Sequence, residues 1–285
     1  MAEVTARAKR AYEDLEFLNS VDARTLRILA EYLEPLQRFS RQRVKDTIVF
    51  FGSARLKPED EAAADVRHFK RLLKQSKTHN KAELEIELKK AQKHFRNAHY
   101  YTEAMELARL LTEWSLTLHD KGQHFVICSG GSGGIMEAAN RGAMLAGGGR
   151  SIGLNISLPT EQMPNPYITQ ELNFEFHYFF MRKFWFMNLA KALIIFPGGF
   201  GTLDEFMELI TLVQTGKITY HLPIIMYGSE YWKKVLNLKV LADEEMISPA
   251  DLQLIHYCDT PEEAFGYLKT NLLGSVDQPR HKKNK

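Results

Sequence analysis

Two glycine-rich loops constrain the fold of this chain more than any other feature. An apolar run at residues 125–128 leads into the first loop at 129–134, and a second run at 192–196 leads into the loop at 197–202. Each loop is followed by a stretch with helical periodicity. A short, β-branched apolar run that ends at a glycine turn is typical of a buried parallel strand. The repeated strand–loop–helix order predicts an α/β protein.

The rest of the chain alternates in the same way. Apolar runs predict further strands at residues 47–51, 151–156, 172–177, 223–227 and 254–257. Helices are expected at 100–119, 135–146, 179–189, 231–238 and 261–269, and from the second glycine loop to residue 213. Strands that alternate with helices imply a doubly wound, mainly parallel sheet with helices on both faces.

Two further segments predict helices outside this alternation. Residues 7–44 carry leucines at helical spacing, and Pro35 is expected to kink or divide the segment. Residues 57–99 are rich in Lys, Glu and Ala and predict a charged helical hairpin with a break at 76–80. We interpret this hairpin as a solvated insertion or an oligomer contact rather than as a catalytic element.

Composition excludes several classes of protein. With 285 residues, 45% hydrophobic and 25% charged, the chain has ample material for a globular core. The net charge is +2, but the last six residues hold four positive charges, so a basic nucleic-acid-binding face is not expected. No apolar stretch approaches the length of a membrane span, and the start lacks the apolar core of a secretory signal. Two distant cysteines form no metal-ligand pattern and favour a reducing, cytoplasmic compartment.

The glycine loops predict a ligand that carries phosphate. In open α/β sheets ligands sit outside the carboxyl ends of the strands, and a helix N-terminus there attracts anions. Neither loop has the Gly-Lys-Ser/Thr of a P-loop, and the third glycine of G-x-G-x-x-G is replaced by Met136 or Asp204. These departures disfavour an NTPase or a standard NAD enzyme and leave a mononucleotide or a sugar phosphate. The alternative is that the glycines only make tight turns.

The second loop has a specific structural alternative of its own. Thr202 and Glu205 match a capping box, with Thr202 as N-cap. Upstream, Arg182 and Lys183 place two charges in an aromatic helix that we expect to be buried, and buried charges need partners. A structural Arg–carboxylate pair or a snorkelling surface arginine would also explain that pair.

At these residues the chain resembles the LOG family, whose members are also described as lysine decarboxylase-like. The family signature P-G-G-x-G-T-x-x-E is matched by residues 197–205, and the family's Arg-Lys pair by Arg182 and Lys183. Residues 130–138 resemble the family's G-G-G-P-G-I-M loop, with serine and glycine in place of the third glycine and the proline. Residues 52–55 resemble the first-strand turn.

The resemblance implies a Rossmann-like fold and hydrolysis of the N-glycosidic bond of nucleoside 5′-monophosphates, AMP or N6-modified AMP, to free base and ribose 5-phosphate. It implies that Arg182 and Glu205 are the catalytic pair. The implied substrate-binding residues are Ser53, Gly130, Gly131, Gly134, Met136, Lys183, Gly198, Gly199, Gly201 and Thr202, with Met136 near the base and the last four at the phosphate. No cofactor and no metal is expected. A decarboxylase would need a lysine for pyridoxal phosphate, and nothing around Lys183 or Lys191 supports one.

A non-catalytic nucleotide or cofactor carrier on the same fold is the alternative function. A carrier needs the glycines but not the charged pair, so the pair favours the hydrolase. The resemblance also implies a homodimer or a larger homo-oligomer with the active site near a subunit interface. The expected partners are a small-molecule nucleoside monophosphate and a second copy of the chain, with no nucleic acid and no membrane. The expected domains are an N-terminal helical extension at 1–45, a catalytic domain at 46–275 that contains the 57–99 insertion, and a basic disordered tail at 276–285.

Overall fold

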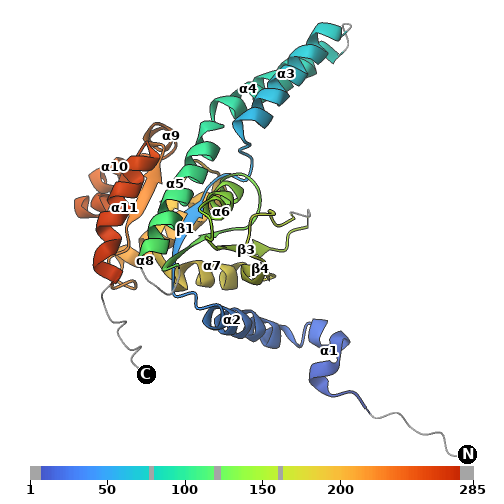
Figure 1. Ribbon diagram of the computed structural model, residues 1–285, viewed down its shortest axis with the longest axis vertical. Helices are drawn as coiled ribbons and strands as arrows, with labels where there is room; N and C mark the ends of the chain where they lie inside the picture. The colour runs from blue at the N-terminus through green and yellow to red at the C-terminus, as the bar shows by residue number, and fades with distance from the viewer. Residues whose placement is uncertain (1–7, 77–79, 119–122, 160–162, 277–285) are drawn as a thin grey trace, which may run out of the picture.

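One parallel sheet organises the protein (Figure 1). The computed structural model describes residues 8–76, 80–118, 123–159 and 163–276. Its strands lie in the order β4-β3-β2-β1-β5-β6-β7, and every neighbouring pair is parallel. The strands are β1 (Asp46–Phe51), β2 (Phe125–Ser129), β3 (Ser151–Ile156), β4 (Asn173–Phe176), β5 (Ala190–Ile195), β6 (Ile224–Tyr227) and β7 (Ile255–Cys258). All seven predicted strands and the predicted α/β class are confirmed.

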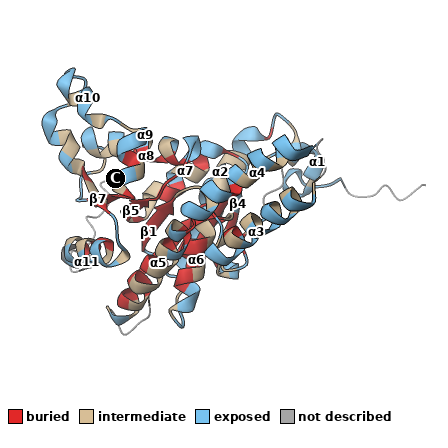
Figure 2. Ribbon diagram, turned by 90° about the horizontal axis from the view of Figure 1, so that it is seen from above, coloured by how far each residue is buried: buried red, intermediate tan, exposed pale blue. Residues whose placement is uncertain are grey.

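Helices cover both faces of the sheet (Figure 2). Successive side chains of a strand point to opposite faces. Ile48 and Phe50 of β1 pack in one buried cluster with α5 (His99–Thr117), α6 (Ile135–Leu145) and α11 (Pro261–Val276). Val49 and Phe51 pack in a second cluster with the helices of the other face. Those helices are α2 (Arg24–Arg41), α7 (Phe179–Asn188), α8 (Phe200–Gln214) and α9 (Ser229–Val235). The short α10 (Leu238–Asp243) follows α9.

The predicted helical hairpin projects from the sheet as an arm (Figure 1). It consists of α3 (Glu59–Gln75) and α4 (Lys81–Arg96), and the residues between them include 77–79, which lie outside the described part of the chain. Only Ala62 and Ala91 of the two helices are buried. The half-buried leucines of the arm therefore pack mainly between its two helices, and only its base meets the body of the protein.

Pro35 does not divide the N-terminal helical segment as the sequence predicted. The segment breaks earlier, after α1 (Leu15–Asn19), and α2 runs through Pro35 without interruption. A proline leaves the carbonyl four residues before it without its helical partner. The indole Nε1 of Trp185 in α7 donates to that carbonyl, on Glu31, at 2.9 Å. The Glu31 carboxylate also accepts from the backbone N–H groups of His177 and Tyr178, so α2 holds the segment that leads into α7.

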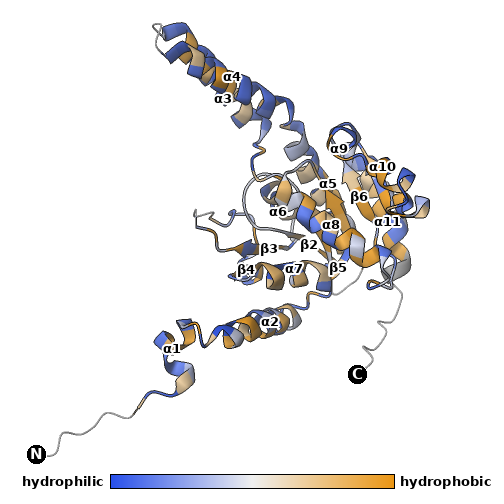
Figure 3. Ribbon diagram, turned by 180° about the vertical axis from the view of Figure 1, so that it is seen from behind, coloured by the Kyte–Doolittle hydropathy of each residue, from blue (hydrophilic) through white to orange (hydrophobic). Residues whose placement is uncertain are grey.

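The leucine stripe of α2 faces away from the sheet. Phe39 and Pro35 pack inward, whereas the leucines at the helical spacing remain 44–55% exposed: Leu26, Leu29, Leu33 and Leu36. Figure 3 shows apolar segments, coloured orange, along α2 and α7. The ring of Tyr32 lies 5.5 Å from that of Phe184, which joins the stripe to the exposed phenylalanines of α7.

The sequence predicted a basic tail and no membrane-spanning helix. The basic residues of the predicted tail fall within 277–285, outside the described residues. Among the described helices, none combines the length and the apolar character needed to cross a bilayer.

The contact between Trp185 and Glu31 gives a test of how α2 tolerates its proline. Trp185→Phe should cost about 1–3 kcal/mol of unfolding free energy, because the Glu31 carbonyl loses its donor. In a Pro35→Ala background the restored backbone N–H can bond that carbonyl, so the same change should cost less. A double-mutant cycle by chemical denaturation measures the difference. An identical cost in both backgrounds would show that the indole N–H does not replace the missing helical bond.

Candidate functional site

The main cavity opens where the order of strands reverses. β1 and β5 are neighbours, and the chain proceeds outward from them in opposite directions along the sheet. In open α/β sheets this switch point, at the carboxyl ends of the strands, is where ligands bind. A cavity of about 670 Å³ lies there, lined by the loops after β1, β2 and β5 and by parts of α6, α7, α8 and α9. The two glycine loops thus open into one cavity, as their positions in the sequence predicted.

Ser53 connects the two glycine loops through its backbone. Its N–H donates to the Pro197 carbonyl at 3.0 Å, and its carbonyl accepts from Ile135 N–H at 3.0 Å. Gly134 adopts φ +67°, and a Cβ there would lie 2.2 Å from the Ser53 carbonyl oxygen. A larger residue at position 134 would therefore separate the first glycine loop from the turn after β1.

The second glycine loop ends in a helix that begins earlier than the capping box required. α8 starts at Phe200 with Gly199 as N-cap and no side-chain cap, so Thr202 lies inside the first turn. The capping-box alternative is therefore wrong. The Thr202 hydroxyl instead lies beside Gly198, where a Cβ would come within 2.1 Å of Oγ1. Tyr231 holds the same loop from α9 by donating its hydroxyl to the Gly198 carbonyl at 2.7 Å.

Arg182 and Glu205 lie side by side in the cavity wall. Arg182 Nη2 lies 3.6 Å from Glu205 Oε1, and the side chains are only 14% and 6% exposed. The guanidinium also lies over the rings of Phe179 and Phe186, at 5.1 and 5.7 Å from their centroids. Arg182 Nε and Glu205 Oε2 are buried and have no hydrogen-bond partner among the described residues. The pair thus presents unsatisfied polar atoms beside the cavity, which a polar ligand can pair.

Burial dominates the ionisation of this pair. It raises the pKa of Glu205 to about 7, against the opposing effects of Arg182 and Lys183. It also lowers the pKa of Arg182, although the nearby Glu205 raises it. A carboxyl group with a pKa near 7 exists in both protonation states around neutral pH, as acid–base and electrostatic catalysis at neutral pH requires.

Most of the predicted site residues line this cavity. They are Ser53, Gly130, Met136, Arg182, Gly198, Gly199, Gly201, Thr202 and Glu205. Gly131, Gly134 and Lys183 are not among the lining residues. The two glycines belong to the first glycine loop but do not border the cavity. The Lys183 ammonium pairs with Asp204 at 2.7 Å and Glu208 at 2.9 Å along α8. Lys183 therefore fixes α7 against α8 instead of facing the cavity.

The structure adds cavity residues that sequence reasoning missed. Asn155 lies near the end of β3, so its predicted place at the end of a strand was a signal for the site. Tyr231 carried no such signal. His94 and Asn97 lie at the end of the charged insertion, which we had interpreted as solvated or as an oligomer contact. Most of the arm is exposed or half-buried, whereas His94 and Asn97 at its base line the cavity.

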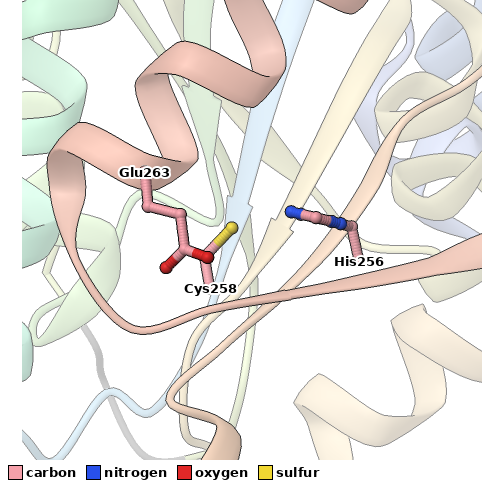
Figure 4. A group of neighbouring side chains, drawn as sticks. All are labelled: His256, Cys258 and Glu263. Atoms are coloured by element: carbon pink, nitrogen blue, oxygen red, sulfur yellow. The ribbon is translucent and has the colours of Figure 1, made fainter.

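A group of possible metal ligands lies away from the cavity, on β7 and α11 (Figure 4). Ligand atoms of His256, Cys258 and Glu263 lie within 4.8 Å of one another. Two of the three also have structural partners: the His256 ring stacks on Tyr267 at 3.8 Å, and Glu263 accepts from Asp259 N–H. Burial and Glu263 raise the pKa of the Cys258 thiol to about 12, which disfavours the metal-binding thiolate.

Comparison with known proteins identifies the family. The "Probable cytokinin riboside 5'-monophosphate phosphoribohydrolase LOGL3" of Oryza sativa subsp. japonica is 30% identical over 177 residues, which cover 60% of this chain and 76% of that protein. The chain belongs to the LOG family. Rice LOGL6, with the same descriptive name, is 29% identical over 191 residues, covering 65% and 67% of the two chains. Rice LOGL5 is 30% identical over 167 residues, covering 56% and 61%.

A family model described as "Possible lysine decarboxylase" matches residues 136–268. This LOG-family region contains α7 and α8, and hence both Arg182 and Glu205. The N-terminal helices and the α3–α4 arm lie outside it. The shared region therefore carries the charged pair, and the additional helices are features that the family model does not describe.

The raised pKa of Glu205 predicts how stability depends on pH. In the unfolded chain the group titrates near its ordinary value of 4.5, and in the folded protein near 7. Between these values the folded protein holds a proton that the unfolded chain has released, so stability falls as pH rises. From pH 4.5 to above 7, the unfolding free energy of the wild type should fall by about 3 kcal/mol relative to Glu205→Gln.

Chemical denaturation at several pH values measures this difference. Glu208→Gln, on the same helix but ion-paired near the surface, is the matched control and should not reproduce it. A constant difference between wild type and Glu205→Gln across pH 4.5–7.5 would contradict the raised pKa.

Proposed function

We propose that this protein hydrolyses the N-glycosidic bond of nucleoside 5′-monophosphates, AMP or N6-modified AMP such as cytokinin riboside 5′-monophosphates. The products are the free base and ribose 5-phosphate. The observation that carries the proposal is the buried Arg182–Glu205 pair at the wall of a cavity that also receives a glycine-rich helix N-terminus. The names of the rice relatives support the same reaction class.

The start of α8 suits the 5′-phosphate. The first backbone N–H groups of a helix have no partner within the helix, and the helix dipole favours an anion at that end. Gly198, Gly199 and Gly201 line the cavity there, and no Cβ obstructs the approach at the latter two. Thr202 adds a hydroxyl on the same turn. Glu205 follows Thr202 by three residues, about one helical turn further along α8.

The charged pair suits the bond-breaking step. Cleavage moves the electron pair of the C1′–N bond onto the base and leaves oxocarbenium character on the ribose, and the oxygen of water then bonds to C1′. An ionised Glu205 carboxylate can stabilise that positive charge, hold the ribose hydroxyls or orient the water. The Arg182 guanidinium remains charged and can stabilise the phosphate or the negative charge that develops on the base. The proton lost by the water balances the one gained by the base.

The decarboxylase description of the family model has less support from the cavity. Decarboxylation through pyridoxal phosphate needs a lysine that forms a Schiff base. No lysine is among the lining residues within the described chain. Lys183 pairs with Asp204 and Glu208, and the Lys191 ammonium lies 3.9 Å from Asp46 Oδ1 and over the ring of Tyr220.

Glu205→Gln separates the hydrolase from a non-catalytic nucleotide carrier. The glutamine keeps the shape of the side chain but cannot carry the charge that stabilises the oxocarbenium ion. We expect turnover of AMP to fall by at least about 100-fold, the scale of one lost electrostatic contribution, while affinity for AMP changes little. Release of adenine and calorimetric binding measure the two quantities. Near wild-type turnover in this variant would remove Glu205 from the mechanism.

We also propose that the protein is a homodimer or a larger homo-oligomer, in the cytoplasm, where its two buried and unbridged cysteines would stay reduced. The exposed leucines of α2 and the half-exposed Phe179, Phe180 and Phe184 of α7 form one apolar face. Large contiguous apolar faces are typical of protein interfaces. Phe179 and the 92% exposed Phe200 also line the cavity, so a second copy on this face would lie at its mouth.

Sedimentation at micromolar concentration tests the assembly. We expect at least twice the monomer mass of 32.8 kDa for the wild type and the monomer mass for the double variant Leu29→Glu/Leu33→Glu. Leu145→Glu, at an equally exposed leucine of α6, is the control and should leave the assembly intact. A fully active wild-type monomer would refute the proposal.

A further inference from the structure

The base of the α3–α4 arm forms part of the cavity wall. His94 lies in the last turn of α4, Asn97 is its C-cap residue, and both line the cavity. Arg55, where the chain enters the insertion, lines it too. The remaining lining residues come from the strand ends, the loops that follow them and the helices α6–α9. The insertion therefore alters the shape and chemistry of the site that we propose binds the nucleotide.

The arm reaches the cavity from the side opposite the charged pair. The turn that leads into the insertion is fixed to α6, because Ser53 accepts a hydrogen bond from Ile135, and Leu56 is buried in the same cluster as Ile135. Met136 follows directly on that helix and lines the cavity. Arg182 and Glu205 come from α7 and α8, which cover the other face of the sheet. His94 and Asn97 thus enter the cavity from the α5–α6 face of the sheet, and Arg182 and Glu205 enter it from the α7–α8 face.

The two side chains suit recognition of a base. Asn97 is exposed, and its amide makes no hydrogen bond with any described residue. An amide that both donates and accepts matches the paired donor and acceptor on an adenine edge. The His94 side chain is half-buried, and an imidazole can stack on a base or bond its ring nitrogens. Neither side chain has a hydrogen-bond partner among the described residues, so both can bond a ligand in the cavity.

We propose that His94 and Asn97 contact the base of the bound nucleotide, and that the helical insertion thereby selects among bases. The inference rests on the proposed function for the class of ligand, a nucleoside 5′-monophosphate. Phosphate and ribose are held by the α8 side of the cavity, and the base is held by the arm. The insertion is then a specificity element, although most of its length stands clear of the site.

Calorimetric titration of the full chain with AMP, UMP and ribose 5-phosphate tests the proposal. Asn97→Ala should weaken AMP binding about 3- to 10-fold, the range for one lost hydrogen bond, and the double variant with His94→Ala should weaken it further. Affinity for ribose 5-phosphate should stay the same, and the preference for AMP over UMP should shrink. Gln92→Ala, exposed on the same helix and absent from the cavity wall, is the matched control.

Two results would overturn the proposal. One is an unchanged AMP affinity in the double variant. The other is an equal loss for AMP and ribose 5-phosphate, which would place these side chains on the sugar phosphate. Thermal melting confirms that each variant is folded, and Asn97→Ser provides a polar replacement should alanine destabilise the C-cap.

The same titrations separate this proposal from the proposed function. A wild-type protein that binds AMP but never releases adenine contradicts the hydrolase, while the comparison of AMP with ribose 5-phosphate still decides the role of the arm. A wild-type protein that binds neither compound contradicts both.

Discussion

A carboxylate buried beside a guanidinium is the interaction on which the site depends. Desolvation of two charges costs free energy that one contact at 3.6 Å, with unsatisfied atoms on both partners, does not fully return. The fold holds the pair in place by other means. Glu31 and Trp185 fix α7 on α2, and Lys183 joins α7 to α8 through Asp204 and Glu208. Contacts outside the cavity thus hold Arg182 and Glu205 in place inside it.

Two helical segments flank the sheet on opposite sides. The N-terminal helix α2 packs against α7, and its leucines remain exposed on the outer side. The α3–α4 arm joins the α5–α6 side and brings His94 and Asn97 to the cavity. α2 packs against α7, which carries Arg182. The base of the arm forms part of the cavity wall on the other face of the sheet. Both therefore affect the same site, although neither belongs to the region that the family model matches.

Patterns with a single physical solution were predictable from the sequence. Short β-branched apolar runs, several of which lead into glycine turns, predicted seven strands, because such runs are typical of a covered parallel sheet. That topology forces both glycine loops to the same edge, and Arg182 and Glu205 flank the same strand, so their meeting followed as well. The family resemblance supplied the proposed roles of these residues, which the fold alone does not assign.

Features that depend on tertiary contacts were not predictable. Pro35 stays inside a helix because Trp185, 150 positions along the chain, satisfies the carbonyl it frees. Thr202 matched a cap, but the glycines before it let the helix begin earlier. Lys183 neighbours Arg182 in sequence, yet the helical rotation of about 100° per residue turns it toward α8. The arm was interpreted as a solvated insertion or an oligomer contact because composition describes most of its length and not its last turn.

The central claim is that the cavity cleaves a glycosidic bond, and identification of the products from wild-type protein and AMP tests it most directly. Chromatography with mass detection should find free adenine and ribose 5-phosphate in equal amounts, formed at a rate proportional to enzyme concentration. Adenosine with inorganic phosphate would reveal cleavage of the phosphate ester instead. That result, or AMP recovered intact although it binds, would contradict the account.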